Sequence, residues 1–233
     1  MHTIVGFHEL RQRINGTRLF DIEEFSLQPS SCTVLSGANG SGKTTLMKII
    51  AGLQRPESCK IVWNNQTIMD WKKARPLLYK HVVYLHQQAF LFDTTVVNNI
   101  GYGLKHKGYG KSQIKQLIEE ALHWVDLEAL ADRHARKLSG GEKQRLALAR
   151  AYVLNPSIML MDEPTANLDP SSRAQTYRLI EQLKQRGIAI LLSSHDVDRA
   201  DIVGDRHVRL CNGTLSDAAS PPRNHVPPLR LIK

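Results

Sequence analysis

The pattern of apolar and polar positions predicts a β-rich opening segment. Residues 3–35 alternate apolar with polar stretches, and the alternation is interrupted at 15–16 (Asn-Gly) and at 29–31 (Pro-Ser-Ser). Breaks of this composition are typical of turns between paired strands. A further short hairpin is expected at 62–65, where Val-Trp precedes Asn-Asn. We therefore predict an antiparallel β subdomain in the N-terminal part of the chain.

Beyond this segment, continuous apolar runs alternate with stretches of helical spacing. The apolar runs predict buried strands at residues 33–35, 81–85, 158–161 and 188–192. The stretches of helical spacing predict helices over 45–51, 142–154 and 172–186, ended by Gly52, Asn155-Pro156 and Gly187. Helices that alternate with wholly apolar strands favour a mainly parallel sheet covered on both faces. The predicted fold class is therefore α/β.

The stretch from 93 to 137 is expected to form a helical lobe inserted into the α/β protein. Ser112 is a suitable N-cap for a helix in it. The apolar positions of that helix fall on one stripe, made of Ile114, Leu117, Ile118, Ala121, Leu122 and Val125. With the helix that follows, the helical subdomain covers 93–150 within one ordered domain, 1–215. Residues 216–233 are rich in proline and lack periodicity, which predicts a disordered or extended tail.

Composition and charge leave several functions open. The chain has 233 residues, 42% of them hydrophobic, and contains no apolar run of the ~20 residues needed to cross a bilayer. No secretory signal is expected, and the three widely spaced cysteines favour reduced thiols in a cytosolic protein. The net charge is +9, with dispersed Lys and Arg and no basic run interleaved with aromatic residues. Anionic lipid, an acidic partner and nucleic acid all fit such a charge.

A phosphate-binding loop is the most specific motif of the chain. It follows a short apolar strand and precedes a predicted helix, so a bound phosphate would lie at a helix N-terminus. Lys43 is placed to reach the β- and γ-phosphates, and the Thr44 hydroxyl is placed to bind Mg²⁺. The complete G-x-x-x-x-G-K-[ST] pattern comprises Gly37, Ala38, Asn39, Gly40, Ser41, Gly42, Lys43 and Thr44. The pattern predicts that the chain binds a nucleoside triphosphate.

Two acidic residues, Asp162 and Glu163, follow directly after the apolar run 158–161. Ligands of open α/β sheets bind at the carboxyl ends of the strands, where this pair would lie. Asp162 suits the Mg²⁺ shell, because Mg²⁺ prefers hard oxygen ligands. Glu163 suits the general base that polarises an attacking water.

The segment Leu138-Ser139-Gly140-Gly141-Glu142 precedes a predicted helix and has two compatible interpretations. Its serine hydroxyl and backbone N–H groups can bind an anion at a helix N-terminus. Ser139 and Glu142 also match an ordinary capping box. The segment alone does not separate these alternatives, since both can hold at once.

The order and spacing of these motifs, together with a later His195, resemble the ATP-binding cassette (ABC) family over residues 20–215. The resemblance implies a P-loop NTPase fold and a Walker A loop that extends from Gly37 to Thr45. It implies that Glu163 is catalytic and that His195 contacts the γ-phosphate. Gln87 corresponds to the glutamine of the Q-loop, which joins Mg²⁺ and the γ-phosphate to the helical lobe.

Further implied residues belong to a head-to-tail homodimer. Ser139, Gly140 and Gly141 would contact the γ-phosphate that is bound by the other subunit, and Asp169 would lie in the D-loop at that interface. The chain departs from the family pattern at two places. Glu142 stands where the family's signature segment, here residues 138–142, usually ends in Gln. The stretch 13–16 lacks the usual aromatic residue beneath the adenine, although Phe7 and Phe20 flank it.

The resemblance implies the ATPase subunit of a membrane transporter, with ATP and Mg²⁺ as its ligands. Its partners would be a second copy, integral-membrane permease subunits and an extracellular or periplasmic solute-binding protein. Such a subunit is cytoplasmic and peripheral on the inner face of the plasma membrane. A lone cassette with this Q-loop sequence resembles importers of small solutes, including oxyanions such as tungstate.

Two alternatives remain beside the importer. The first is a free cassette of a lipid or lipoprotein exporter. The second is a soluble ABC ATPase that acts on nucleic acid. Translation-type members carry two cassettes, and chromosome-type members insert a long coiled coil before the signature; neither feature is present, so no direct nucleic-acid partner is expected.

Overall fold

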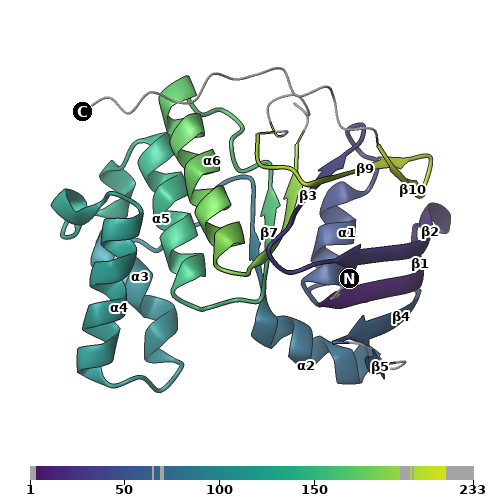
Figure 1. Ribbon diagram of the computed structural model, residues 1–233, viewed down its shortest axis with the longest axis horizontal. Helices are drawn as coiled ribbons and strands as arrows, with labels where there is room; N and C mark the ends of the chain where they lie inside the picture. Colours follow the sequence, from purple (N-terminus) through teal and green to yellow (C-terminus); the bar gives the residue numbers. More distant parts are fainter. Residues whose placement is uncertain (1–3, 65, 69–70, 195–199, 201, 219–233) are drawn as a thin grey trace.

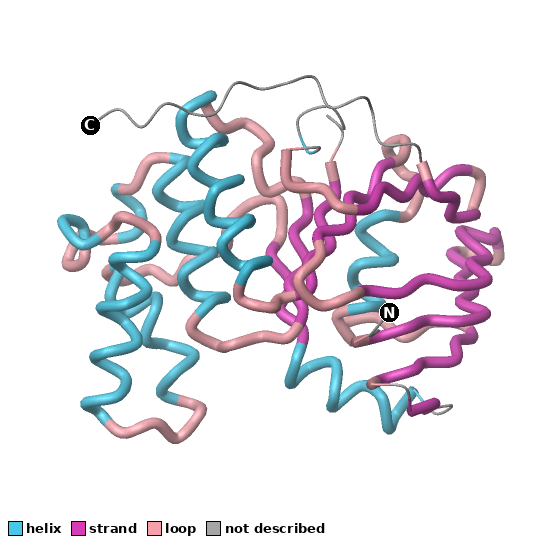
Figure 2. The backbone as a smooth tube through the Cα atoms, in the orientation of Figure 1, coloured by secondary structure: helices cyan, strands magenta, loops and turns pink. Residues whose placement is uncertain are grey.

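The computed structural model describes residues 4–64, 66–68, 71–194, 200 and 202–218. The predicted residue His195 and residues 219–233 lie outside this part of the chain. Figures 1 and 2 show an antiparallel sheet at one end, a second sheet in the middle and helices at the other end.

The strands are β1 (Val5–Ile14), β2 (Thr17–Leu27), β3 (Cys32–Ser36), β4 (Ser58–Trp63), β5 (Gln66–Ile68), β6 (Val82–Leu85), β7 (Ile158–Asp162), β8 (Ala189–Ser193), β9 (Arg206–Cys211) and β10 (Thr214–Asp217). The helices are α1 (Lys43–Ile50), α2 (Trp71–His81), α3 (Val96–Lys105), α4 (Lys111–Trp124), α5 (Gly140–Tyr152) and α6 (Pro170–Gln185), with 3₁₀ turns η1 (Glu128–Leu130) and η2 (Ala135–Lys137).

The N-terminal sheet has the strand order β2-β1-β4-β5. All its pairs are antiparallel. The β1–β2 turn is formed by Asn15 (φ 51°) and Gly16 (φ 79°), left-handed conformations that Asn and Gly adopt most readily. The predicted opening hairpin is therefore confirmed.

The central sheet has the order β10-β9-β3-β8-β7-β6. Every pair in it is parallel except β9–β10. β7 and β8 are buried at every position, which explains their continuous apolar sequences. The parallel arrangement brings the carboxyl ends of β3, β6, β7 and β8 to one edge of the sheet.

The two faces of the central sheet bury different side chains. Leu35, Leu160 and Leu191 pack with α1 and the N-terminal sheet. Val34, Met161 and Ile190 pack with the helices α3 to α6. Figure 1 accordingly shows α1 on one side of the central strands and α5 and α6 on the other. These arrangements confirm the predicted α/β class with its mainly parallel core and inserted helices.

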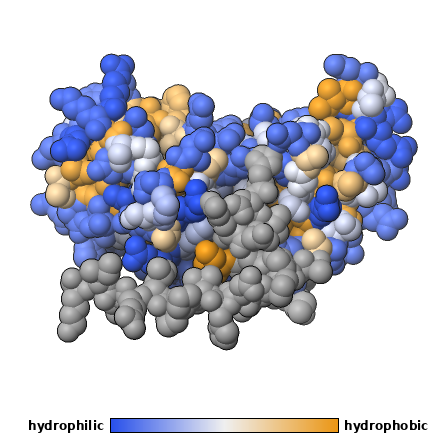
Figure 3. All heavy atoms as spheres, turned by 90° about the horizontal axis from the view of Figure 1, so that it is seen from above, coloured by the Kyte–Doolittle hydropathy of each residue, from blue (hydrophilic) through white to orange (hydrophobic). Residues whose placement is uncertain are grey.

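The helical lobe and the N-terminal sheet form the two ends of the molecule, and Figure 3 shows a hollow in the outline between them. No helix in the described ranges is both long enough and apolar enough to cross a membrane. The tail was predicted to begin at residue 216, but residues 216 and 217 belong to β10, which extends to Asp217.

Several helix boundaries differ from the predictions. α4 begins after Gly110 with no side-chain cap, so the prediction that Ser112 is the N-cap is wrong. α6 begins at Pro170 instead of residue 172, and its N-cap is Asp169. The helix α2 was not predicted, because Pro76 and its many charged residues obscure the periodicity.

Candidate active site

The predicted phosphate loop connects β3 to the N-terminus of α1. Gly37, Gly40 and Gly42 have φ of 153°, 77° and 105°, values that L side chains rarely adopt. A Cβ at Gly37 would lie only 2.5 Å from the backbone oxygen of Leu210. The glycines therefore allow the loop to curl tightly against β9.

Two side chains of the loop fit an anionic ligand. Lys43 is only 7% exposed, and its Nζ donates hydrogen bonds to the backbone oxygens of Gly37 (2.8 Å) and Ala38 (3.1 Å). The Ser41 hydroxyl is buried and has no hydrogen-bond partner among the described residues. A buried donor without a partner is costly, and a phosphate oxygen would satisfy it. The loop thus has the donors that a triphosphate requires.

Asp162, at the end of β7, is the centre of a hydrogen-bond network. Its Oδ2 accepts hydrogen bonds from Thr44 Oγ1 and from the Tyr84 hydroxyl, both at 2.9 Å. Its Oδ1 accepts one from Ser193 Oγ at 2.6 Å. The side chain is 8% exposed, so these bonds offset much of the cost of burying it. Burial and the neighbouring Asp162 raise the pKa of Tyr84.

The Thr44–Asp162 pair fits a magnesium ion. The hydroxyl and the carboxylate are hard oxygen donors from two elements that meet beside the phosphate loop. The described residues contain no cluster of three or more His, Cys, Asp and Glu that would suit a metal bound by protein alone. Mg²⁺ in nucleotide sites requires few protein ligands, because phosphate and water supply the others. Gln87, also predicted as a ligand, contacts Glu163 in this structure.

Glu163 follows Asp162 in a left-handed conformation (φ 48°). Its backbone N–H donates to Ser193 Oγ at 3.0 Å, and its carboxylate accepts a 3.1 Å hydrogen bond from the Gln87 amide. The structure thus brings Lys43, Thr44, Asp162, Glu163 and Gln87 to one region.

The structure does not bring the segment 138–142 to the phosphate loop. α5 begins there and packs on the face of the sheet opposite to α1. Ser139 is its N-cap and forms a capping box with Glu142, as predicted. The hydrogen bond from the Ser139 N–H to Glu142 lowers the pKa of this carboxyl. Gly141 has a packing role, because a Cβ there would lie 2.2 Å from Ser172 Oγ and 2.7 Å from Ser172 Cβ.

Asp169 also has a local role. Its carboxylate caps α6 by accepting a 2.9 Å hydrogen bond from the Ser172 N–H, and interaction with the Ser172 side chain, followed by that with the Ser172 N–H, lowers the pKa of Asp169. Near the β1–β2 turn, Ile14 is exposed, whereas Phe7 and Phe20 are fully buried. The two flanking aromatics therefore cannot stack on a base in this structure.

The contributions of Tyr84 and Ser193 to the Asp162 network were not predicted. The sheet register supplies the missing information. Ser193 pairs with Asp162, and Tyr84 pairs with Leu160, on the strands that flank β7. A sequence reading that placed β6 and β8 beside β7 would have identified both residues.

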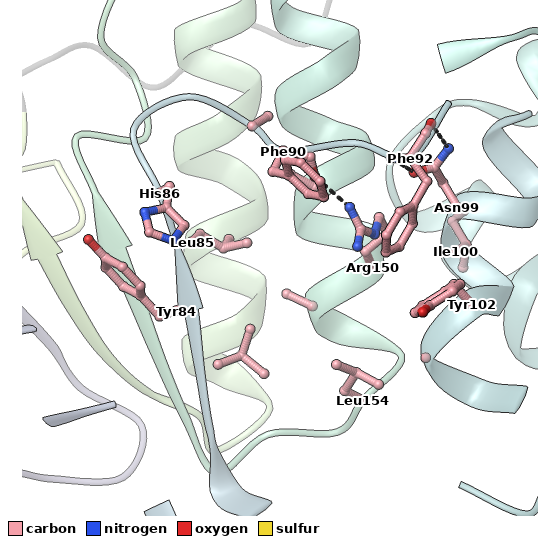
Figure 4. A pocket seen from close by; sticks show the side chains of 15 residues that line it. Tyr84, Leu85, His86, Phe90, Phe92, Asn99, Ile100, Tyr102, Arg150 and Leu154 are labelled. Atoms are coloured by element: carbon pink, nitrogen blue, oxygen red, sulfur yellow. Dashed lines mark hydrogen bonds between the residues drawn. The ribbon is translucent and has the colours of Figure 1, made fainter. Parts of the chain in front are cut away.

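A pocket of about 380 Å³ lies beside Gln87, between β6, α3 and α5. Arg150 reaches into it, donates to the backbone oxygen of Phe90 and lies 4.4 Å from the centre of the Phe92 ring (Figure 4). Burial lowers the pKa of Arg150. Phe90 and Tyr102 line the pocket but remain 72% and 49% exposed. The pocket therefore presents aromatic side chains to solvent.

The fold and the phosphate loop define a nucleotide-binding α/β protein. A family model described as "ABC transporter" matches residues 20–166, more than half of the chain. The chain therefore belongs to the ABC transporter family.

Known proteins agree with this assignment. The chain is 33% identical over 219 residues to the Fe(3+) ions import ATP-binding protein FbpC of Photorhabdus laumondii, with 93% of this chain and 61% of that protein covered. It is 33% identical over 223 residues to the sulfate/thiosulfate import ATP-binding protein CysA of Pseudomonas aeruginosa, with 93% and 67% covered. The chain thus spans about three fifths of the length of FbpC. The structure of cbiO1 from Clostridium perfringens, part of the ABC transporter complex cbiONQ, matches with a TM-score of 0.85 at 27% identity, covering 93% of this chain and 88% of that one.

Proposed function

We propose that the chain is the ATP-hydrolysing subunit of an ABC importer. The observation that carries this proposal is the network in which Thr44 and Asp162 meet beside the phosphate loop, with Glu163 next to them. Such an arrangement fits phosphoryl transfer, in which positioning and charge stabilisation supply most of the acceleration. The comparison with two import ATP-binding proteins supports the same activity.

Each of these residues would have a separate role in ATP hydrolysis. The loop N–H groups, Ser41 and Lys43 bind the phosphates, and Lys43 stabilises charge that develops on the γ-phosphate. The Glu163 carboxylate orients a water and accepts its proton as the water oxygen attacks the γ-phosphorus. The bond from the γ-phosphorus to the bridging oxygen breaks, and ADP leaves with that oxygen. Thr44 and Asp162 would hold Mg²⁺, which would neutralise phosphate charge when bound. The proposed γ-phosphate contact of His195 belongs to the same step.

The complete site would require a second copy of the chain. The segment 138–142 lies across the sheet from the loop of its own subunit. In a head-to-tail homodimer, Ser139, Gly140 and Gly141 of one subunit would close over the triphosphate of the other, and Asp169 would lie near that interface. ATP would then hold the dimer closed until it is hydrolysed.

We propose that the pocket beside Gln87 is the docking site for the permease. Phe90 and Tyr102 offer an apolar, partly exposed surface at the junction of the helical lobe and the core. A displacement of the Glu163 side chain during hydrolysis would be transmitted to this surface through its hydrogen bond with Gln87. A permease partner would place the chain on the inner face of the plasma membrane. A solute-binding protein would complete the importer. The relatives are named for import of Fe(3+) ions and of sulfate/thiosulfate, which agrees with a small solute, and an oxyanion such as tungstate is the solute proposed from the sequence.

Substitution of Glu163 tests the activity. Glu163→Gln should abolish ATP turnover and trap an ATP-bound dimer, which gel filtration detects. Glu119→Gln is the control, since Glu119 is an exposed residue of α4 that pairs only with Lys115 among the described residues. Normal hydrolysis by Glu163→Gln would refute the assigned role.

The shared site has its own test. Lys43→Ala and Ser139→Ala should each be inactive alone, and a mixture of the two should regain one working site in each mixed dimer. No recovery at any mixing ratio would contradict the head-to-tail arrangement.

A further inference from the structure

The positive charge of the chain is concentrated in one segment. Residues 71–118 contain eight Lys and Arg and a single acid, Asp93, a net charge of +7, and the flanking acids Asp70, Glu119 and Glu120 reduce this to +4 over residues 70–120. The other 23 Lys and Arg are dispersed along the rest of the chain, as described from the sequence. The eight side chains, called here the basic edge, are Lys72, Lys73, Arg75, Lys80, Lys105, Lys107, Lys111 and Lys115.

The fold gathers the basic edge on one side of the molecule. Figures 1 and 2 place α2 and the turn between α3 and α4 at the same lower edge. Lys107, in that turn, donates to the backbone oxygen of Leu154. The charge of Lys107 also contributes, after burial and Lys80, to a lowered pKa of His81 at the end of α2. The basic residues of α2 and those of the α3–α4 turn are therefore close enough to interact electrostatically.

Most of the basic edge forms no ion pair with another described residue. All eight side chains belong to exposed residues. Asp93 pairs with Arg136 and His134, which do not belong to the basic edge. Lys115 pairs with Glu119. Within the described ranges, Lys73, Lys80, Lys105 and Lys111 form no ion pair.

The chemistry of the basic edge selects among anionic partners. Seven of its eight members are lysines, which act as flexible point charges, whereas recognition of nucleic acid favours the planar, bidentate fork of arginine. Arg75, the one arginine, donates to the Tyr79 hydroxyl. Tyr79 is 48% exposed on α2, and an aromatic ring among lysines suits the interface of a membrane.

We propose that the basic edge binds the anionic headgroups of a lipid bilayer. The proposal rests on the proposed function, which places the chain at a membrane and a permease in the pocket that opens beside α3. The lysines on α2 and on the α3–α4 turn would then contact lipid on either side of the permease. This contact orients the subunit before the permease is engaged.

Vesicle flotation with the full chain tests the proposal. Binding to phosphatidylcholine vesicles should rise with the mole fraction of phosphatidylglycerol and should fall as salt is raised from about 0.1 M to about 1 M, where the Debye length drops to about 3 Å. The triple variant Lys73→Gln, Lys80→Gln, Lys111→Gln should bind on the order of 100-fold more weakly. The matched control Arg55→Gln, Arg178→Gln, Arg209→Gln removes three charges from exposed residues elsewhere and should bind as the natural chain does.

Several outcomes would overturn the proposal. Equal loss in the two triple variants would show a diffuse effect of net charge. Equal binding to pure phosphatidylcholine would show apolar insertion. Release from anionic vesicles by a small excess of duplex DNA or RNA would show a nucleic-acid surface. ATP hydrolysis without lipid binding would refute this inference alone, whereas lipid binding without hydrolysis would refute only the proposed function.

Discussion

The Gln87 amide donates a 3.1 Å hydrogen bond to the Glu163 carboxylate, although 76 residues separate the two in sequence. Gln87 lies in the connection from β6 to α3, beside the pocket that Phe90 and Tyr102 line. Glu163 follows the buried strand β7. One hydrogen bond therefore joins the proposed general base to the surface proposed for the permease.

Loss of this hydrogen bond should impair hydrolysis more than binding. Gln87→Ala should lower kcat on the order of 100-fold, because Glu163 loses the group that orients it. The affinity for ATP should change little, since the phosphate loop is intact. Steady-state kinetics and equilibrium nucleotide binding measure the two effects. Gln88→Ala is the matched control and should retain the natural kcat; an equal loss in both variants would indicate a general disturbance of the loop.

The two glycines of the segment 138–142 should respond differently to the same change. Gly141→Ala should lower the free energy of unfolding by about 1–3 kcal/mol, because its Cβ would overlap Ser172 and push α5 from α6. Gly140→Ala should fold as well as the natural chain, since a Cβ at Gly140 would meet no other side chain within 4 Å. Urea denaturation of both variants provides the measurement. Equal stability of the two would contradict the packing role assigned to Gly141.

How far the sequence predicts this site depends on which contacts are local. Lys43, Thr44 and Asp162 follow from motifs, because a glycine loop and a strand that ends in acids determine their own geometry. Tyr84 and Ser193 do not, because their contacts with Asp162 depend on the order of strands within the sheet. For the same reason, nothing local identified β9 and β10, which complete the sheet beside β3. The pocket could not be predicted from local sequence either, because it forms only where β6, α3 and α5 pack together.

The capping box at the start of α5 should give a pH-dependent contribution to stability. Ser139→Ala should lower the free energy of unfolding by about 1 kcal/mol at neutral pH, because the Glu142 N–H loses its acceptor. The folded-state pKa of Glu142 lies below its ordinary value of 4.5. Its ionised form therefore contributes stability above about pH 4.5, and that part is lost as pH falls through the lowered pKa.

Urea denaturation at a series of pH values tests the capping box. The variant Glu142→Gln should remove the acid-dependent part while leaving the Ser139 cap in place. A difference between the natural chain and Glu142→Gln that stays constant from neutral to acid pH would contradict the ionic contribution of Glu142.

The three cysteines should differ sharply in reactivity. Burial raises the pKa of Cys32 to about 12, with a smaller contribution from Asp205, and burial also raises that of Cys59 to about 12. At about pH 8, roughly one in ten thousand of these thiols is therefore ionised, and the thiolate is the reactive form. Cys211 is exposed at the end of β9. A disulfide reagent should modify one thiol per chain rapidly in the folded protein and two more after unfolding in urea. The variant Cys211→Ser should lose the rapid phase only; a rapid phase that persists in it would contradict the assignment of that phase to Cys211.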